Sequence, residues 1–77
     1  MFEISLSDMK KNDFCIIKRL ETKGKLRRRL LDLGFTEGTK IRCVNISPFG
    51  DPKAFSVRGT VIALRKEDSS AVLGVKL

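Results

Sequence analysis

The sequence predicts a mainly β fold with one α-helix inserted between the first two main strands. Short runs rich in β-branched and aromatic residues recur along the 77 residues, separated by glycine, proline and polar turn residues. A single segment, residues 25–33, instead has leucines at helical spacing. A chain of this length can bury only one modest core. We therefore expect a single domain over residues 1–77.

The first main strand is predicted over residues 13–20, which are rich in β-branched and aromatic side chains. Its adjacent apolar residues Ile16 and Ile17 indicate either burial on both faces or a β-bulge. Ahead of it, apolar and polar residues alternate over residues 2–6. Asn12 suits a left-handed turn position, because its short amide tolerates a positive φ.

The helix is predicted over residues 25–33, because three leucines there fall on one face at spacings of four and three. Gly34 is expected to end it, since a C-terminal cap usually needs a positive φ. Phe35, just beyond, is placed to fold back onto the leucines. These leucines are Leu26, Leu30 and Leu33.

In the second half of the chain, glycines indicate turns, and the alternation of apolar residues shifts by one position once. Gly38 stands at the third place of a four-residue turn, which suits type II geometry, and Gly59 allows a tight bend. The apolar phase slips once between residues 41 and 46, as expected where a strand bends sharply. Residues 67–71 can form one helical turn. The remaining strands are predicted over residues 40–47, 53–58, 60–65 and 72–77.

About five short strands with one inserted helix predict a small, strongly bent β-barrel of the SH3-like kind. The longest apolar runs, such as residues 61–64, are far below the roughly 20 residues that cross a bilayer, and no signal-peptide pattern opens the chain. We therefore expect a cytoplasmic protein. It contains no histidine, which excludes nucleophilic catalysis with a histidine base. We expect that it is not an enzyme.

Cys15 and Cys43 are the two cysteines, and neither has a second cysteine two residues away. This spacing excludes a zinc knuckle and a thioredoxin-like pair. Buried free thiols are favoured by residue type. One disulfide, or a site for a soft or borderline metal ion completed by a carboxylate, remains as an alternative. The metal ligands stay unassigned.

The net charge of +7 predicts an anionic partner without choosing among nucleic acid, a membrane surface and an acidic protein. Arg27, Arg28 and Arg29 form the densest basic cluster, which either binds phosphates or acidic side chains or is simply a solvated face. The chain has five Phe and neither Tyr nor Trp, so stacking platforms for nucleic acid are scarce. We expect most of these Phe in the core.

Phe49 is the expected exception among the phenylalanines. It stands in a loop between Pro48 and Gly50. Such a side chain either offers an exposed apolar contact to a partner or caps the open end of the barrel.

Several groups of residues together form a specific pattern over essentially the whole chain, and with it the chain resembles the FeoA domain family, ferrous iron transport protein A. In two places the chain departs from the family pattern, with Glu37 where members often have proline and Asn12 where they often have glycine. Both substitutes fit their turns. The matching groups are residues 6–10, 29–35, 38–41, 48–52, 57–59 and 62–65, with Ala71 and Val75.

The resemblance implies a small cytoplasmic SH3-like protein that assists FeoB, the large GTPase-coupled membrane transporter of ferrous iron in bacteria. On this basis we expect a non-enzymatic module that docks on the cytoplasmic GTPase region of FeoB. Arg27, Arg28, Arg29 and Phe49 are the candidate contacts, and Gly34, Gly38 and Gly59 serve the turns. Regulatory binding of Fe(II) or another divalent transition metal, weak self-association, and binding of RNA or DNA remain open.

Overall fold

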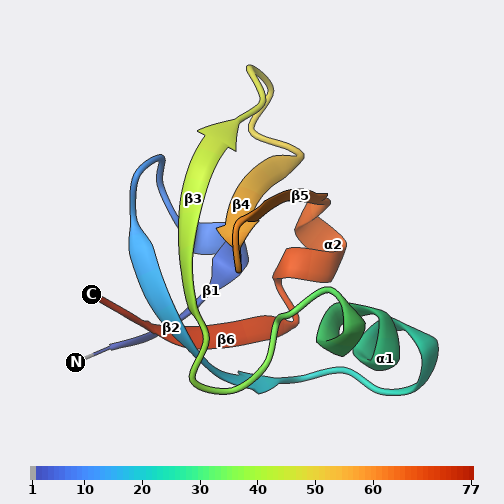
Figure 1. The fold of residues 1–77 in the computed structure, drawn as a ribbon. Helices are drawn as coiled ribbons and strands as arrows, with labels where there is room; N and C mark the ends of the chain where they lie inside the picture. Colours follow the sequence, from blue (N-terminus) through green and yellow to red (C-terminus); the bar gives the residue numbers. More distant parts are fainter. Residues whose placement is uncertain (1) are drawn as a thin grey trace.

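The computed structural model describes residues 2–77 as a bent sheet with two α-helices beside it (Figure 1). No helix in this part of the chain has both the length and the apolar character needed to cross a bilayer. The elements are β1 (Glu3–Ser5), the 3₁₀ turn η1 (Leu6–Asp8), β2 (Phe14–Leu20), α1 (Gly24–Asp32), β3 (Lys40–Ile46), β4 (Lys53–Val57), β5 (Thr60–Leu64), α2 (Lys66–Ser69) and β6 (Val72–Lys76).

Within residues 2–77 the six strands form one antiparallel sheet in the order β1-β6-β2-β3-β4-β5. The helix α1 lies between β2 and β3 in the chain, which confirms the predicted mainly β fold with its inserted helix. The additional strand is β1, whose Ile4 lies opposite Gly74 of β6. This strand is only three residues long and lies within the alternating residues 2–6, and its pairing joins residues far apart in the chain.

The core lies inside the curve of the sheet and is closed by η1 and by the leucine face of α1. Leu30 of α1 is buried, and Leu26 and Leu33 are partly buried against the same cluster. Along β2, β3 and β4, alternate residues point inward, as a half-buried strand requires. The buried apolar residues are Leu6, Met9, Cys15, Ile17, Leu30, Phe35, Ile41, Cys43, Phe55, Val57, Leu64 and Val72.

Two register shifts bend the sheet. One lies between Ile17 and Arg19 in the pairing of β2 with β6, one residue beyond the predicted position, because Ile16 and Ile17 themselves pair regularly with Val75 and Gly74. The other lies between Cys43 and Asn45 in the pairing of β3 with β4, where the apolar phase slips. A bulge increases the local twist of a strand. The two shifts therefore allow short strands to close around a small core.

The helix α1 ends in the predicted way at Gly34, whose φ is 106°. The Gly34 N–H donates to the Leu31 carbonyl and the Phe35 N–H to the Leu30 carbonyl, each at 3.0 Å. These two bonds form a Schellman motif, in which the left-handed residue lets the chain turn back over the last helical carbonyls. Phe35 is thereby folded into the core beside Leu30, and both are fully buried.

The predicted turns at Gly38 and Gly59 are also present. Gly38 has φ 86° in a turn closed by the Thr39 N–H and the Thr36 carbonyl at 3.1 Å, in agreement with type II geometry. In the β4–β5 hairpin, Gly59 has φ 83° and Arg58 also has a positive φ, 50°. Two successive positive φ values define a type I′ turn, which joins strands through a two-residue loop.

Candidate partner-binding surfaces

The three arginines of α1 are all exposed. Arg27 Nη1 donates to the Leu20 carbonyl at 3.3 Å, which holds the side chain near the end of β2. Successive helical residues are about 100° apart around the axis, so Arg28 and Arg29 point in other directions. The cluster is therefore a diffuse basic surface around α1 instead of a single contact point.

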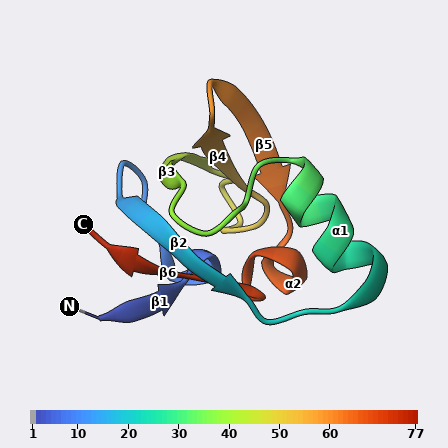
Figure 2. The ribbon, with the colours of Figure 1, turned by 60° about the horizontal axis from the view of Figure 1, so that its bottom comes forward.

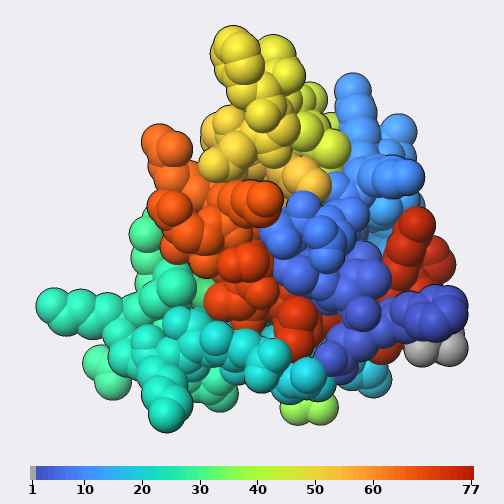
Figure 3. Space-filling view, turned by 180° about the vertical axis from the view of Figure 1, so that it is seen from behind, coloured from blue at the N-terminus to red at the C-terminus, as the bar shows by residue number. Residues whose placement is uncertain are grey.

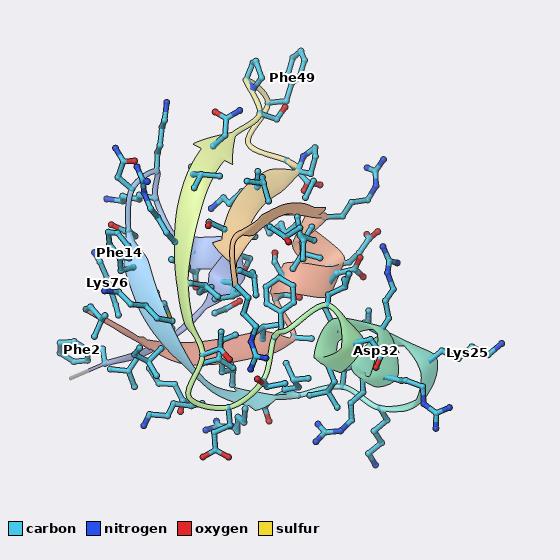
Figure 4. The ribbon with its side chains drawn as sticks, viewed as in Figure 1. Phe2, Phe14, Lys25, Asp32, Phe49 and Lys76 are labelled. Carbon is cyan, nitrogen blue, oxygen red and sulfur yellow. The ribbon has the colours of Figure 1, made fainter. Side chains whose placement is uncertain are left out.

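Phe49 lies at the tip of the β3–β4 loop with 97% of its side chain exposed (Figure 4). The interpretation as an exposed apolar residue is confirmed, and the alternative, a cap on the barrel, is wrong. Figure 4 also shows that Phe49 and the labelled α1 residues Lys25 and Asp32 lie at different ends of the molecule. The structure therefore does not bring the α1 arginines and Phe49 into one site.

Phe49 borders an open groove of about 470 Å³ that the sequence patterns did not indicate. Three segments form its walls, the chain around η1, the β3–β4 loop and α2, which Figure 3 shows next to one another in blue, yellow and orange. Three of the lining residues are lysines, and two are aspartates. The groove is lined by Ser7, Asp8, Met9, Lys10, Ile46, Phe49, Gly50, Asp51, Lys53, Lys66 and Ser69.

Two side chains, Lys53 and Asp51, hold the walls of this groove together through three hydrogen bonds. Lys53 Nζ donates to the carbonyls of Ser7 and Met9 at 2.6 and 2.7 Å, so that β4 is tied to the η1 segment. Asp51 Oδ1 accepts the backbone N–H of Lys66 at 2.8 Å, which ties the loop to the start of α2. Charge-assisted hydrogen bonds of this kind are among the stronger ones in proteins. The loop that carries Phe49 is therefore anchored at its base.

The expectation that most phenylalanines lie in the core is wrong. Phe35 and Phe55 are buried, but Phe2 is 86% and Phe14 39% exposed. Phe14 faces outward because its neighbour Cys15 faces the core, and side chains alternate along a strand. The Phe14 ring is covered instead by Lys40 Nζ at 4.8 Å and by a second cation on β3. That cation is Arg42, whose Cζ is 5.8 Å from the ring centroid.

Both cysteines are buried free thiols, as the residue type favours, and no disulfide joins them. Burial raises the pKa of the Cys15 thiol to about 11 and also raises the pKa of Cys43. Metal ions bind the thiolate, so a thiol that holds its proton is a poor ligand. In the described part of the chain, residues 2–77, no three side chains of His, Cys, Asp or Glu come together as a metal site.

The raised pKa of Cys15 makes stability depend on alkaline pH. Between pH 9 and about 11 the unfolded thiol loses its proton while the folded one keeps it, so the unfolded state gains stability as pH rises. We expect the free energy of unfolding, measured with guanidinium chloride, to fall by about 2 kcal/mol over this range. Cys15→Ala should remove the part of the slope that comes from this thiol, whereas the part from Cys43, whose pKa is also raised, should stay. A slope that is unchanged in the variant would contradict the assignment.

The comparisons with known proteins agree with this architecture. The family model of the FeoA domain matches residues 4–76. A curated relative from Porphyromonas gingivalis, a fusion of Fe(2+) transport protein A with the Fe(2+) transporter FeoB, is 33% identical over 67 residues, or 87% of the chain. The chain spans only 8% of the length of that fusion protein.

Two solved structures show the same fold along almost the whole chain. A FeoA-like protein from Clostridium acetobutylicum is 28% identical, with a TM-score of 0.90 over 100% of this chain and 90% of the other. FeoA from Stenotrophomonas maltophilia, solved in complex with zinc and described as an SH3 domain protein, is 27% identical, with a TM-score of 0.83 over 92% and 88%. The predicted SH3-like barrel is confirmed, and with the family model spanning residues 4–76, the chain belongs to the FeoA domain family.

Proposed function

We propose that this protein is a cytoplasmic, non-enzymatic accessory protein of bacterial ferrous iron uptake that docks on the GTPase region of a FeoB-type transporter. The observation that carries the proposal is the Porphyromonas gingivalis relative, in which a FeoA segment and FeoB belong to one polypeptide. A covalent link keeps two domains at a high effective concentration. A separate FeoA chain needs a binding surface to achieve the same association.

The groove beside Phe49 supplies the most suitable surface for this docking. Its exposed aromatic ring is the kind of residue that dominates binding energy when a partner buries it. Lys10 and Lys66 are exposed at the rim of the same groove, where they can pair with acidic side chains of a partner. The absence of histidine and the protonated state of the buried thiols support a binding role without catalysis.

Phe49→Ala tests this surface. We expect it to weaken binding to the soluble cytoplasmic domain of FeoB about 30-fold, because loss of a central aromatic contact costs about 2 kcal/mol or more. Single alanine substitutions of Arg27, Arg28 or Arg29 should each cost no more than about 1 kcal/mol, since exposed charge pairs contribute little. Isothermal titration calorimetry with and without guanine nucleotide measures the affinity of each variant for the FeoB domain.

Phe2→Ala is the matched control, because Phe2 is also highly exposed but lies outside the groove. It should leave the affinity unchanged. Equal losses for Phe2→Ala and Phe49→Ala would contradict the assignment of the surface. If no binding is observed in either nucleotide state, docking on FeoB itself is refuted.

Binding of RNA or DNA is the second candidate, and one feature of the sheet favours it. Phe14 lies on an outer face between Lys40 and Arg42, and aromatic rings flanked by cations bind single-stranded nucleic acid. Fluorescence anisotropy with a labelled oligonucleotide at low salt should then show binding that weakens steeply as salt is added. Phe14→Ala should reduce it, and an unchanged anisotropy at low salt would dismiss this function.

A further inference from the structure

The strand β5 is an open edge of the sheet. Among the described residues 2–77 it pairs only with β4, and it lies at the end of the strand order (Figure 2). Because the type I′ turn makes Val57 and Thr60 a hydrogen-bonded pair, the next pair outward, Ser56 with Val61, is not hydrogen-bonded. Hydrogen-bonded and non-hydrogen-bonded pairs alternate along the ladder, so the pair Ala54 with Ala63 is also not hydrogen-bonded. The backbone N–H and C=O groups of Val61 and Ala63 therefore point away from β4.

These outward groups have no partner within residues 2–77, where neither backbone nor side chains bond to them. The edge is also exposed and apolar, with Val61 63% exposed and Ala63 exposed as well. Natural edge strands are usually protected by a charge, a proline, a bulge or very short length. The opposite edge, β1, is three residues long and carries Glu3, whereas β5 has five residues and none of these protections. It is thus suited to pair with a further strand.

Charge decides which strand fits. Residues 53–66, which include the whole β4–β5 hairpin, contain four Lys or Arg and no Asp or Glu. Arg65 and Lys66 are exposed at the end of β5, and within the described chain neither forms an ion pair. A second copy paired antiparallel about Ile62 would bring Arg65 and Lys66 of each copy, just beyond β5, near Arg58 in the β4–β5 turn of the other copy, and a cluster of like charges is unfavourable. An acidic strand is instead attracted to this edge.

We infer that the β5 edge is a docking site for an extended, acidic peptide segment of a partner protein, which adds to the sheet beyond β5. Backbone hydrogen bonds to Val61 and Ala63 supply affinity, as in other cases of strand addition. Apolar residues at alternate positions of the segment cover Val61, and carboxylates beyond them meet Arg65 and Lys66. The inference goes beyond docking on FeoB, because it depends on neither Phe49 nor the identity of the transporter.

The test uses the ¹⁵N-labelled full chain and a synthetic peptide, acetyl-Glu-Glu-Val-Thr-Val-Thr-Val-Glu-Glu-amide. We expect amide shifts to change most at Val61 and Ala63, and hydrogen exchange of both amides to slow. Ala63→Pro removes one outward N–H without breaking the β4 ladder, a position where an edge strand tolerates proline. It should weaken peptide binding about tenfold or more.

Three controls separate this surface from others. Ala63→Ser keeps the N–H and should bind the peptide as the unmodified protein does. Phe49→Ala should also leave peptide binding unchanged, so failure of this inference is distinct from failure of docking on FeoB. A peptide with lysine in place of every glutamate should bind at least about tenfold more weakly.

Several results would overturn the inference. One is a shift map centred on the groove or on α1. Another is equal peptide affinity for Ala63→Pro and Ala63→Ser. Concentration-dependent sedimentation of the free protein that Ala63→Pro abolishes would assign the edge to a second copy of the chain instead of an acidic partner.

Discussion

Replacing Gly74 with alanine is expected to lower the free energy of unfolding by about 3 kcal/mol, at the upper end of what overpacking usually costs. Gly74 is buried in β6 between β1 and β2. A Cβ at this position would lie against Cys15 Sγ and only 2.6 Å from the Ile16 carbonyl oxygen. The oxygen belongs to the backbone of β2, so it cannot move aside without disturbing the pairing of the two strands.

Urea unfolding followed by circular dichroism measures this loss, and two variants make it specific. Gly24→Ala is the matched control, because Gly24 has a positive φ but no atom within 4 Å of the added Cβ, and it should cost only about 1 kcal/mol. In the double variant Cys15→Ala with Gly74→Ala, one of the two clashes is removed. The combined loss should then be smaller than the two single losses together. Equal costs at Gly74 and Gly24 would contradict the packing argument.

Gly74 illustrates what local sequence patterns cannot reveal. Gly34, Gly38 and Gly59 were predicted because each follows an apolar run or stands at a fixed place in a turn, which is a local signal. Gly74 lies inside a strand, and its need for glycine arises from Cys15 and Ile16, about sixty residues earlier in the chain. Only the pairing of β2 with β6 makes that requirement visible.

In the candidate site, too, some features have a local sequence signal and others depend on the folded structure. The exposure of Phe49 could be predicted, because proline and glycine on either side place it in a loop. The groove beside it could not, since its walls come from three segments that meet only in the folded protein. The outward position of Phe14 was missed for a different reason. Aromatic residues are usually core residues, and here the strand parity and two cations from β3 override that preference.

The open edge of β5 could not be predicted from the sequence, because it depends on the order of the strands in the sheet. The apolar run of residues 61–64 is consistent with a strand, but nothing in residues 60–64 shows whether a neighbour pairs with its second side. The unprotected apolar composition is informative only once the strand order places β5 at the end of the sheet. Composition and topology together, and neither alone, identify this surface.

Phe35→Ala is expected to destabilise the protein by about 3 to 5 kcal/mol, the usual cost of removing a buried aromatic side chain. Phe35 is fully buried beside Leu30, and its N–H closes the Schellman motif at the end of α1. The substitution leaves that hydrogen bond in place but empties the space between the helix and the sheet. Since a domain of this size loses roughly 4–8 °C per kcal/mol, the melting temperature should fall by more than about 12 °C.

Phe49→Ala is the matched control, because it is the same substitution at a side chain that is 97% exposed. It should change the free energy of unfolding by no more than about 0.5 kcal/mol. The pair therefore separates the two roles of phenylalanine in this protein: loss of Phe35 should reduce stability, whereas loss of Phe49 should reduce partner binding in a protein that remains folded. Similar losses of melting temperature in both variants would show that the β3–β4 loop is part of the folding core, and would remove the basis for treating Phe49 as a binding residue.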